Sequence, residues 1–312
     1  MRLDGIHHIS AMTGDARGNL DFYTRVMGLR LVAKTVNQDD PGVYHLFYAD
    51  ERGSPGAELT FFEYPGLPRG RAGAGMVHRI ISAVGSEAAL DFWQERLGDQ
   101  GVGVERASAG ALRFADPEGL GHELVVADRD RPLRAEHPDI PAEHALSGFV
   151  GVRAYSAAPA RSGELLEGVL GAESAGDDAW ELRGEGRGAT IAFDAPPEER
   201  RLSGAGTVHH VAWATTRAEH PRWHERLVEA GVGATPVIDR YYFHSIYFRE
   251  PSGVLYEIAD DGPGFTRDMP VEELGSRVIL PAWLEEHRAE VEARLTPLPD
   301  PRAGATGGTV SR

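Results

Sequence analysis

Two pairs of adjacent histidines stand in short apolar segments of the chain. His7 and His8 lie in GIHHIS (5–10), and His209 and His210 lie in GTVHHVAW. Both segments have the β-branched and small apolar residues that are typical of strands. Because neighbouring strand residues point to opposite faces, at most one histidine of such a pair is expected to bind a metal directly.

These segments belong to repeats that run through the chain. WQERLGDQGVG (93–103) and WHERLVEAGVG (223–233) share Trp, Glu-Arg-Leu and Gly-Val-Gly in register, as expected for the ends of two related amphipathic helices. FADPEGLGHE (114–123) and FREPSGVLYE (248–257) share Phe, an acid, Pro, Gly and a final Glu. The Pro and Gly indicate a hairpin turn, which places the Glu on the outgoing strand.

The repeats divide the chain into four modules, each with a strand, a helix and then several strands. The sequence therefore predicts an α+β fold of four βαβββ modules, forming two paired-module domains with cup-shaped mixed sheets. A C-terminal helical extension follows, with a helix around PAWLEEHRAEVEARL. The modules span about 5–64, 75–128, 148–195 and 206–260.

The predicted domain boundaries follow the order of the modules along the chain. Residues 131–147 are rich in proline and charge, and we interpret them as a linker. Residues 1–130 then form the N-terminal pair of modules, and residues 148–265 form the C-terminal pair. Residues 266–312 form the extension, whose last dozen residues are expected to be disordered.

The first strands of the four modules can be aligned on their leading glycine, and the alignment shows which modules have a possible metal ligand at the same position. His8 and His210 occupy one equivalent position, whereas the second module has Arg79 there and the third has Val152. Arginine stays protonated and valine has no donor atom, so neither binds a metal.

A glutamate position follows a similar pattern. Glu257 ends the hairpin motif of the fourth module and Glu123 ends that of the second, but the third module has no glutamate in IAFDAPP. Glu58 and Glu63 are possible counterparts in the first module. In the second module, Glu123 is predicted to form a structural salt bridge with Arg79.

Only the fourth module retains both histidine and glutamate, and the first module supplies a further histidine. Two imidazoles and one carboxylate make the facial triad that holds non-haem Fe(II) and leaves three positions open. The alternative is that these strand histidines are ordinary core or surface residues. We predict the metal ligands to be His8, His210 and Glu257.

The composition limits the other possibilities. The chain has no cysteine, which excludes disulfides, thiolate metal sites and a catalytic thiol. A net charge of -16 without a basic cluster argues against binding to nucleic acid or to anionic membranes. No apolar run is long enough for a membrane span, and the N-terminus lacks a signal-peptide pattern, so we expect a cytoplasmic protein.

Five segments of the chain together point to a known family: GIHHIS, YHLFYADERGSPGAELTFF, GTVHHVAW, DRYYFHSIYFREPSGVLYE and GFTRD. With them the sequence resembles the vicinal oxygen chelate superfamily of glyoxalases, bleomycin resistance proteins and extradiol dioxygenases, and most closely the ring-cleaving branch that includes hydroquinone and chlorohydroquinone 1,2-dioxygenases. The resemblance implies opening of a hydroquinone- or catechol-type ring with both atoms of O2. It also implies a bound metal, which would be Fe(II), Mn(II) or another divalent ion.

The resemblance also implies supporting roles for four side chains near the metal. His7 and His209 would orient the ligands, Tyr247 would exchange a proton or hydrogen bond with the substrate, and Arg240 would stabilise an anionic group. Each has a structural alternative. The tyrosine would be a buried strand residue, the arginine would form a surface ion pair, and the histidines would face the other side of the sheet.

The sequence does not assign a role to three further residues near these motifs, and it leaves other functions of the protein possible. We interpret His244, Tyr44 and His45 as packed or exposed side chains. A glyoxalase-like isomerase, a thiol transferase or a non-catalytic small-molecule binder would use the same module. Four modules in one chain favour the dioxygenase. The expected partners are a small aromatic diol and O2, and sheet edges together with the C-terminal helix predict a homo-oligomer.

Overall fold

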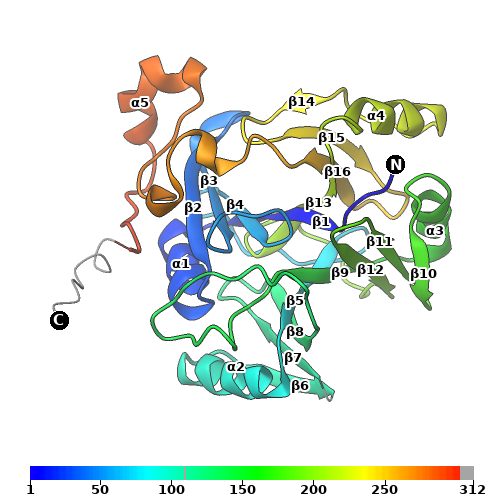
Figure 1. Cartoon of the computed structure of the whole chain (residues 1–312), viewed down its shortest axis with the longest axis horizontal. Coiled ribbons are helices and arrows are strands. Elements are labelled where there is room, and N and C mark those ends of the chain that lie inside the picture. The colour runs from blue at the N-terminus through cyan, green and yellow to red at the C-terminus, as the bar shows by residue number, and fades with distance from the viewer. Residues whose placement is uncertain (109, 303–312) are drawn as a thin grey trace.

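The computed structural model describes residues 1–108 and 110–302, and it confirms the α+β fold of paired modules (Figure 1). Two eight-stranded mixed sheets curl beside each other, with helices at the periphery. One continuous hydrophobic core includes residues from all four modules. No helix in the described part of the chain is long and apolar enough to cross a lipid bilayer.

The first sheet is built from the first and fourth modules, in the order β14-β15-β16-β13-β1-β4-β3-β2. Its strands are β1 (Ile6–Thr13), β2 (Arg30–Asn37), β3 (Asp40–Ala49), β4 (Glu58–Glu63), β13 (Thr207–Thr215), β14 (Ile238–Asp239), β15 (His244–Arg249) and β16 (Leu255–Asp260).

The second sheet is built from the second and third modules, in the order β10-β11-β12-β9-β5-β8-β7-β6. Its strands are β5 (Val77–Val84), β6 (Val104–Ser108), β7 (Ala111–Ala115), β8 (Gly121–Val126), β9 (Phe149–Tyr155), β10 (Glu173–Gly176), β11 (Ala179–Arg183) and β12 (Gly188–Asp194).

The sheets therefore pair the modules differently from their order along the chain. β1 pairs antiparallel with β13, and β5 pairs antiparallel with β9. Each of these strands would be an edge of its own module, and the pairing satisfies its free backbone groups. Each sheet thus combines a module from 1–130 with one from 148–265, while the boundaries at 131–147 remain a prediction. The predicted ligand set of His8, His210 and Glu257 requires the first module to pack against the fourth, and the pairing of β1 with β13 confirms this contact.

Each module has a helix after its first strand. Trp93 and Leu97 in the second module, and Trp223 and Leu227 in the fourth, are fully buried, which confirms that the repeated helix motif belongs to the core. The helices are α1 (Ala16–Asp21), which continues as a π-helical turn (Phe22–Val26), α2 (Glu87–Asp99), α3 (Pro159–Gly168) and α4 (His220–Glu229).

The C-terminal extension follows the first sheet with short helical turns. The predicted helix around 281–295 is observed in part, as a 3-10 turn (Ala282–His287) followed by α5 (Arg288–Glu292). Two further 3-10 turns precede it (Phe265–Arg267 and Val271–Glu273). The expected disorder at the C-terminus falls, from residue 303 onward, outside the described residues.

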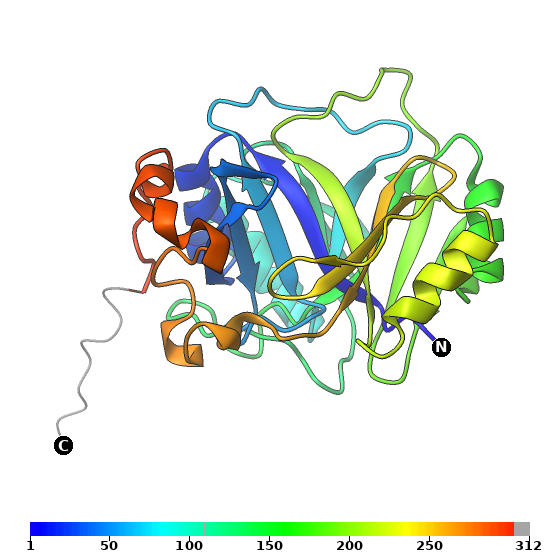
Figure 2. The ribbon, with the colours of Figure 1, turned by 90° about the horizontal axis from the view of Figure 1, so that it is seen from above.

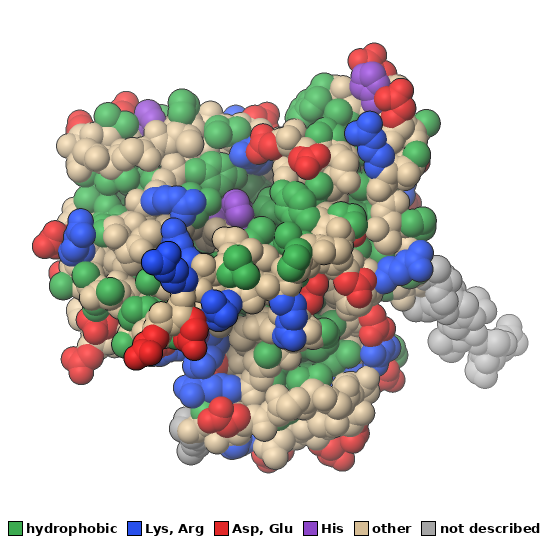
Figure 3. Space-filling model, turned by 180° about the vertical axis from the view of Figure 1, so that it is seen from behind, with side chains coloured by type: hydrophobic (Ala, Val, Ile, Leu, Met, Phe, Trp, Pro, Cys, Tyr) green, Lys and Arg blue, Asp and Glu red, His purple; other side chains and the backbone are tan. Residues whose placement is uncertain are grey.

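The segments that precede β5 and β13 lie side by side, as Figure 2 shows for the two long loops at its upper edge. Arg69 forms a parallel bridge with Ala205, and Arg71 an antiparallel bridge with Leu202. Lys and Arg side chains gather near the centre of the face shown in Figure 3, although the chain as a whole is acidic.

An ionic cluster ties three strands of the second sheet together. His78 on β5 lies 2.8 Å from Asp194 on β12, and the Nε of Arg153 on β9 donates to the same carboxylate at 2.7 Å. The hydrogen bond from Arg153, assisted by His78, lowers the pKa of Asp194 to about 2 from its ordinary 3.8.

Substitution Asp194→Asn should therefore lower the free energy of unfolding by about 1 kcal/mol at pH 7, less than the full pKa shift implies because the side chain is 32% exposed. A depressed carboxyl pKa stabilises the fold above the unfolded value and loses that effect as pH falls toward the folded value. Urea unfolding should show that the difference in free energy of unfolding between the native protein and the variant decreases as the pH falls from ~4 to ~2. A difference that stays constant with pH would contradict this assignment.

Candidate metal centre

Strand pairing brings together the three residues predicted to bind metal. In the β1–β13 ladder, His8 lies opposite Ala212 and His210 lies opposite Ser10, while Glu257 on β16 lies beside Ala212. The Nε2 atoms of the two histidines are 3.1 Å apart. The Oε2 atom of Glu257 is 2.9 Å from the His210 Nε2 and 3.3 Å from the His8 Nε2. All three side chains are buried.

These atoms fit a divalent cation. Ligands ~2.1 Å from one ion and at right angles to each other stand ~3 Å apart, which matches the three separations. The buried Oε2 of Glu257 has no hydrogen bond of acceptable geometry within the described chain, whereas its Oε1 accepts one from the Ser245 hydroxyl. A buried carboxylate oxygen and two imidazole nitrogens that converge in this way form a set of ligand atoms that a divalent cation can bind.

The protonation states also suit metal binding. Burial alone would raise the pKa of Glu257, but the imidazoles of His8 and His210 hold it well below its usual range. Burial lowers the pKa of His210. An ionised carboxylate and a neutral imidazole are the forms that bind metals.

The two flanking histidines lie where the register of the β1–β13 ladder shifts by one residue. The extra residue is His7 on β1 and His209 on β13. Such bulges redirect side chains, and the Nδ1 atoms of His7 and His8 are consequently 3.0 Å apart. The expectation that adjacent rings point to opposite faces is therefore wrong here, because it assumes a regular strand. The corresponding distance between His209 and His210 is 2.8 Å.

One assignment of protons satisfies the hydrogen bonds behind His8. If its Nε2 binds metal, its Nδ1 carries the proton and donates to the Nδ1 of His7. The Nε2 of His7 then donates to the backbone carbonyl of Asp260, 3.0 Å away. His7 and the end of β16 thus hold the His8 ring in the tautomer that presents Nε2.

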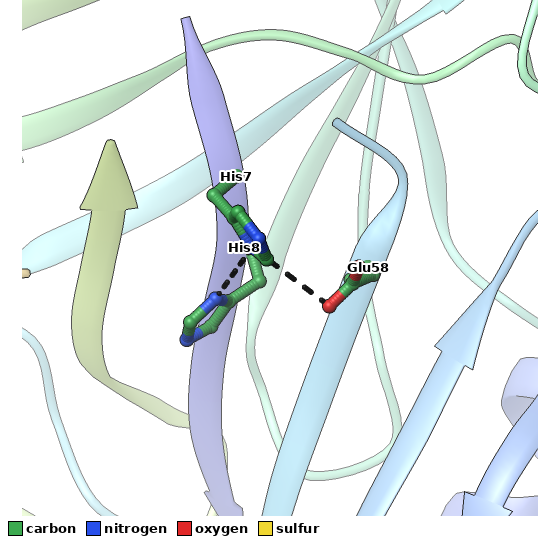
Figure 4. A group of neighbouring side chains, drawn as sticks. All are labelled: His7, His8 and Glu58. Carbon is green, nitrogen blue, oxygen red and sulfur yellow. Dashed lines mark hydrogen bonds and ion pairs between the residues drawn. The ribbon is translucent and has the colours of Figure 1, made fainter. Parts of the chain in front are cut away.

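Glu58 lies on the far side of His7, as Figure 4 shows. Its Oε2 is 3.9 Å from the Nδ1 of His7, and these two residues with His8 form a second group of potential metal ligands. Burial raises the pKa of Glu58 well above its usual range, which favours a neutral acid that binds metal poorly. The triad that includes Glu257 is therefore the better candidate for a metal centre.

His8 and His210 of the triad line a cavity of about 430 Å³ on the first sheet, and Glu257 lies buried behind them. The lining is largely aromatic, with a few polar groups. It includes His8, His45, Phe47, Phe62, Tyr64, His209, His210, Arg240, Tyr241, Tyr242, Phe243 and Tyr247.

Arg240 and Tyr247 lie together in this cavity. The Nε of Arg240 donates to the Tyr247 hydroxyl at 3.3 Å, and its guanidinium carbon stands 5.2 Å from the centre of the tyrosine ring. Arg240 also forms an ion pair with Asp39 at 3.2 Å. The predicted alternatives for Arg240, an ion pair or a place in the cavity, therefore both describe the same side chain. Burial, with Glu257 nearby, raises the pKa of Tyr247, which keeps the phenol protonated at neutral pH.

The three residues of open role lie in different places. His45 lines the cavity, with its ring centre 4.1 Å from that of Phe47, and its Nε2 is 2.9 Å from the Thr60 hydroxyl. His244 is not among the cavity-lining residues, and its Nδ1 is 3.2 Å from the Asp260 carboxylate. Tyr44 is buried away from the cavity.

The sequence reasoning missed two residues that contact the triad. Ser245 supports Glu257, and it lies two residues before Tyr247 on the same strand, so period-two alternation would have indicated its direction. The ring centre of Phe243 lies 5.0 Å from that of His7 and 4.8 Å from that of His8. No sequence signal separates this phenylalanine from the core aromatics, since the loop before β15 positions it.

The strand register corrects two of the predicted equivalences. In the second sheet Ile81 lies opposite Gly151, as Ser10 lies opposite His210 in the first, so the third-module counterpart of the ligand histidine is Gly151 and not Val152. The third module, like the first, has one residue fewer after its leading glycine.

The glutamate position shows a similar displacement. Ser10 pairs with Thr60 in the β1–β4 ladder, so Thr60 is the first-module counterpart of Glu257, in place of Glu58 or Glu63. The predicted salt bridge between Arg79 and Glu123 is confirmed, at 3.1 Å.

Comparison with known proteins agrees with this architecture. Residues 5–124 and 155–258 match the family model of the Glyoxalase/Bleomycin resistance protein/Dioxygenase superfamily. A curated relative from Bacillus subtilis, named Putative ring-cleaving dioxygenase MhqA, is 39% identical over 96% of this chain and 100% of its own length. The chlorohydroquinone/hydroquinone 1,2-dioxygenase of Sphingobium indicum is 34% identical over 93% of this chain and 95% of its own.

Solved structures show the same fold. The crystal structure of a putative dioxygenase from Bacillus subtilis superposes with a TM-score of 0.90 at 37% identity, covering 96% of this chain and 98% of that one. Glyoxalase I from Zea mays has a TM-score of 0.57 at 15% identity, covering 82% of this chain and 92% of that one, and shares the fold alone. The relatives that match over nearly their whole length are named as a putative ring-cleaving dioxygenase and as a hydroquinone 1,2-dioxygenase, and the chain belongs to the glyoxalase/bleomycin resistance protein/dioxygenase superfamily.

Proposed function

We propose that this protein is a non-haem Fe(II) dioxygenase that opens a hydroquinone- or catechol-type ring with O2. The observation that carries the proposal is the buried triad of His8, His210 and Glu257 at an aromatic cavity. Fe(II) held by this triad would supply the redox-active centre at which a diol and dioxygen react. The names of the full-length relatives support the same reaction class.

The cavity suits a small aromatic diol. Its volume of about 430 Å³ exceeds that of one substituted ring, and Phe47, Phe62 and Phe243 offer apolar surface for the faces of the ring. Arg240 and Tyr247 supply a permanent positive charge and a protonated phenol. These two groups can donate hydrogen bonds to a substrate oxygen and stabilise the negative charge that it acquires.

The flanking histidines prepare the ligands for this chemistry. His7 and His209 each contact the Nδ1 of the following histidine, which leaves the Nε2 atoms free for the metal. Burial, together with the neighbouring His210, lowers the pKa of His209 to about 3, so its ring is neutral and its Nδ1 can accept a hydrogen bond from the Nδ1–H of His210.

Tyr247→Phe is expected to keep its iron but to lower kcat by about 10²-fold, because the phenol exchanges a hydrogen bond or proton with the substrate oxygen. Oxygen uptake under saturating diol would measure this change. Tyr44→Phe is the matched control, since that hydroxyl lies outside the cavity and its loss should leave kcat unchanged. Equal kcat and KM in the Tyr247 variant and the native protein would exclude this role.

The reaction class itself is tested by anaerobic loading with Fe(II) or Mn(II), followed by oxygen uptake with hydroquinones and catechols. A glyoxalase-like isomerase would instead isomerise a hemithioacetal, and a thiol transferase would add a thiol to an electrophile, and neither reaction would consume oxygen. A non-catalytic binder would bind the diols and leave them intact. Turnover of a hemithioacetal without oxygen uptake on any diol would refute the proposal.

A further inference from the structure

The second sheet has its own cavity, of about 740 Å³, separate from the metal-centre cavity. We call it the second cup. It is formed by β5, β6, β7, the turn before β8 and the loop around Arg69 to Ala72. Its charged lining residues are Arg69, Arg71, Arg79, Glu105, Arg113 and Glu118.

At the positions equivalent to two residues of the metal triad and to Tyr247 of the first sheet, the second sheet has two arginines and a glutamate. Arg79 occupies the position of His210, Glu123 that of Glu257, and Arg113 that of Tyr247, because Arg113 faces Glu123 as Tyr247 faces Glu257. Both guanidinium groups donate to the same Oε2 of Glu123, at 3.1 Å from Arg79 and 2.9 Å from Arg113.

This arrangement leaves positive charge directed at the cavity. Glu123 is only 10% exposed and neutralises one arginine, whereas the side chains of Arg79 and Arg113 are 23% and 36% exposed. Within the described chain, the hydrogen bonds of these two guanidinium groups go to Glu123 alone. Their remaining N–H groups are free to bind an anion, and a structural salt bridge would need only one of the two arginines.

The surroundings add two features. The four arginines that line the second cup, Arg69, Arg71, Arg79 and Arg113, outnumber its lining glutamates, Glu105 and Glu118. Glu123 beneath the arginine pair offsets one of the two remaining positive charges, so one is left over. The cavity wall also has an apolar part, which includes Val77, Val104, Phe114 and Leu120.

We propose that the second cup binds a small organic carboxylate, with the anionic group on Arg79 and Arg113 and the apolar body against Val104 and Phe114. A planar carboxylate matches the guanidinium fork, and the apolar wall favours it over an inorganic anion. The site is independent of the metal centre and does not rest on the proposed function.

Titration calorimetry of the metal-loaded protein with benzoate, cis,cis-muconate and inorganic phosphate tests this proposal. Saturable binding of benzoate or muconate is expected, and the preferred one distinguishes an aromatic from an aliphatic acid. Arg113→Leu should weaken that binding by at least about tenfold, and Arg113→Lys should have a smaller effect. Arg106→Leu is the matched control, because Arg106 pairs with Glu87 and Asp91 and does not line the second cup.

A second control separates the two cavities. The variant His8→Ala should bind the acid as tightly as the native protein, since it alters only the metal centre. The proposal is overturned if binding is lost in His8→Ala, if Arg113→Leu binds normally, or if phosphate alone binds. Thermal melting of each variant confirms that it is folded before the affinities are compared.

Discussion

Replacement of His8 by alanine is expected to abolish stoichiometric Fe(II) retention and, with it, ring-cleaving activity. His8 contributes one of three converging atoms, with its Nε2 3.1 Å from that of His210 and 3.3 Å from the Glu257 Oε2. Two ligands cannot hold the ion in the facial arrangement that three provide. Iron analysis after anaerobic loading and desalting measures the loss directly, without reference to any substrate.

The matched control for this prediction is His78→Ala. His78 is also a strand histidine next to a ligand-equivalent position, but it lies in the second sheet and pairs with Asp194. It should retain iron fully. An iron-replete and fully active His8→Ala protein would refute the assignment of the metal centre, whatever the reaction proves to be.

Replacement of Trp223 by alanine should lower the free energy of unfolding by about 3–5 kcal/mol. Trp223 is fully buried between α4 and the first sheet, and its indole nitrogen donates to the Thr215 hydroxyl at 2.9 Å. The substitution removes this contact and leaves a cavity that the surrounding strands cannot fill. A loss of this size is a large fraction of the ~5–15 kcal/mol that stabilises a typical domain.

Trp283→Ala provides the comparison, since Trp283 is 56% exposed in the C-terminal extension. Its effect should stay within about 0.5 kcal/mol. Denaturant unfolding of both variants, followed by circular dichroism, gives the two values under one condition. Similar losses for both tryptophans would show that the repeated helix motif does not anchor the core.

Internal repetition made much of this fold predictable. Helix motifs around Trp93 and Trp223 and hairpin motifs that end at Glu123 and Glu257 recur in register, and residues in register occupy equivalent places in a fold. The same logic failed where a module differs in length by one residue. Aligning the third module on its leading glycine indicated Val152, but hydrogen-bonded pairing identifies Gly151.

Residue types and spacing along the chain were sufficient to identify His8, His210 and Glu257 as possible ligands, because only histidine and carboxylate remain in a chain without cysteine. The tertiary structure decided how they meet. β1 pairs with β13 across about two hundred residues, and bulges at His7 and His209 turn the flanking rings toward the ligands. Such pairing and bulges depend on contacts between distant segments, which no local pattern specifies. The arginine pair of the second cup likewise depends on the tertiary structure, because only the folded chain brings Arg79 and Arg113 to the same glutamate, Glu123.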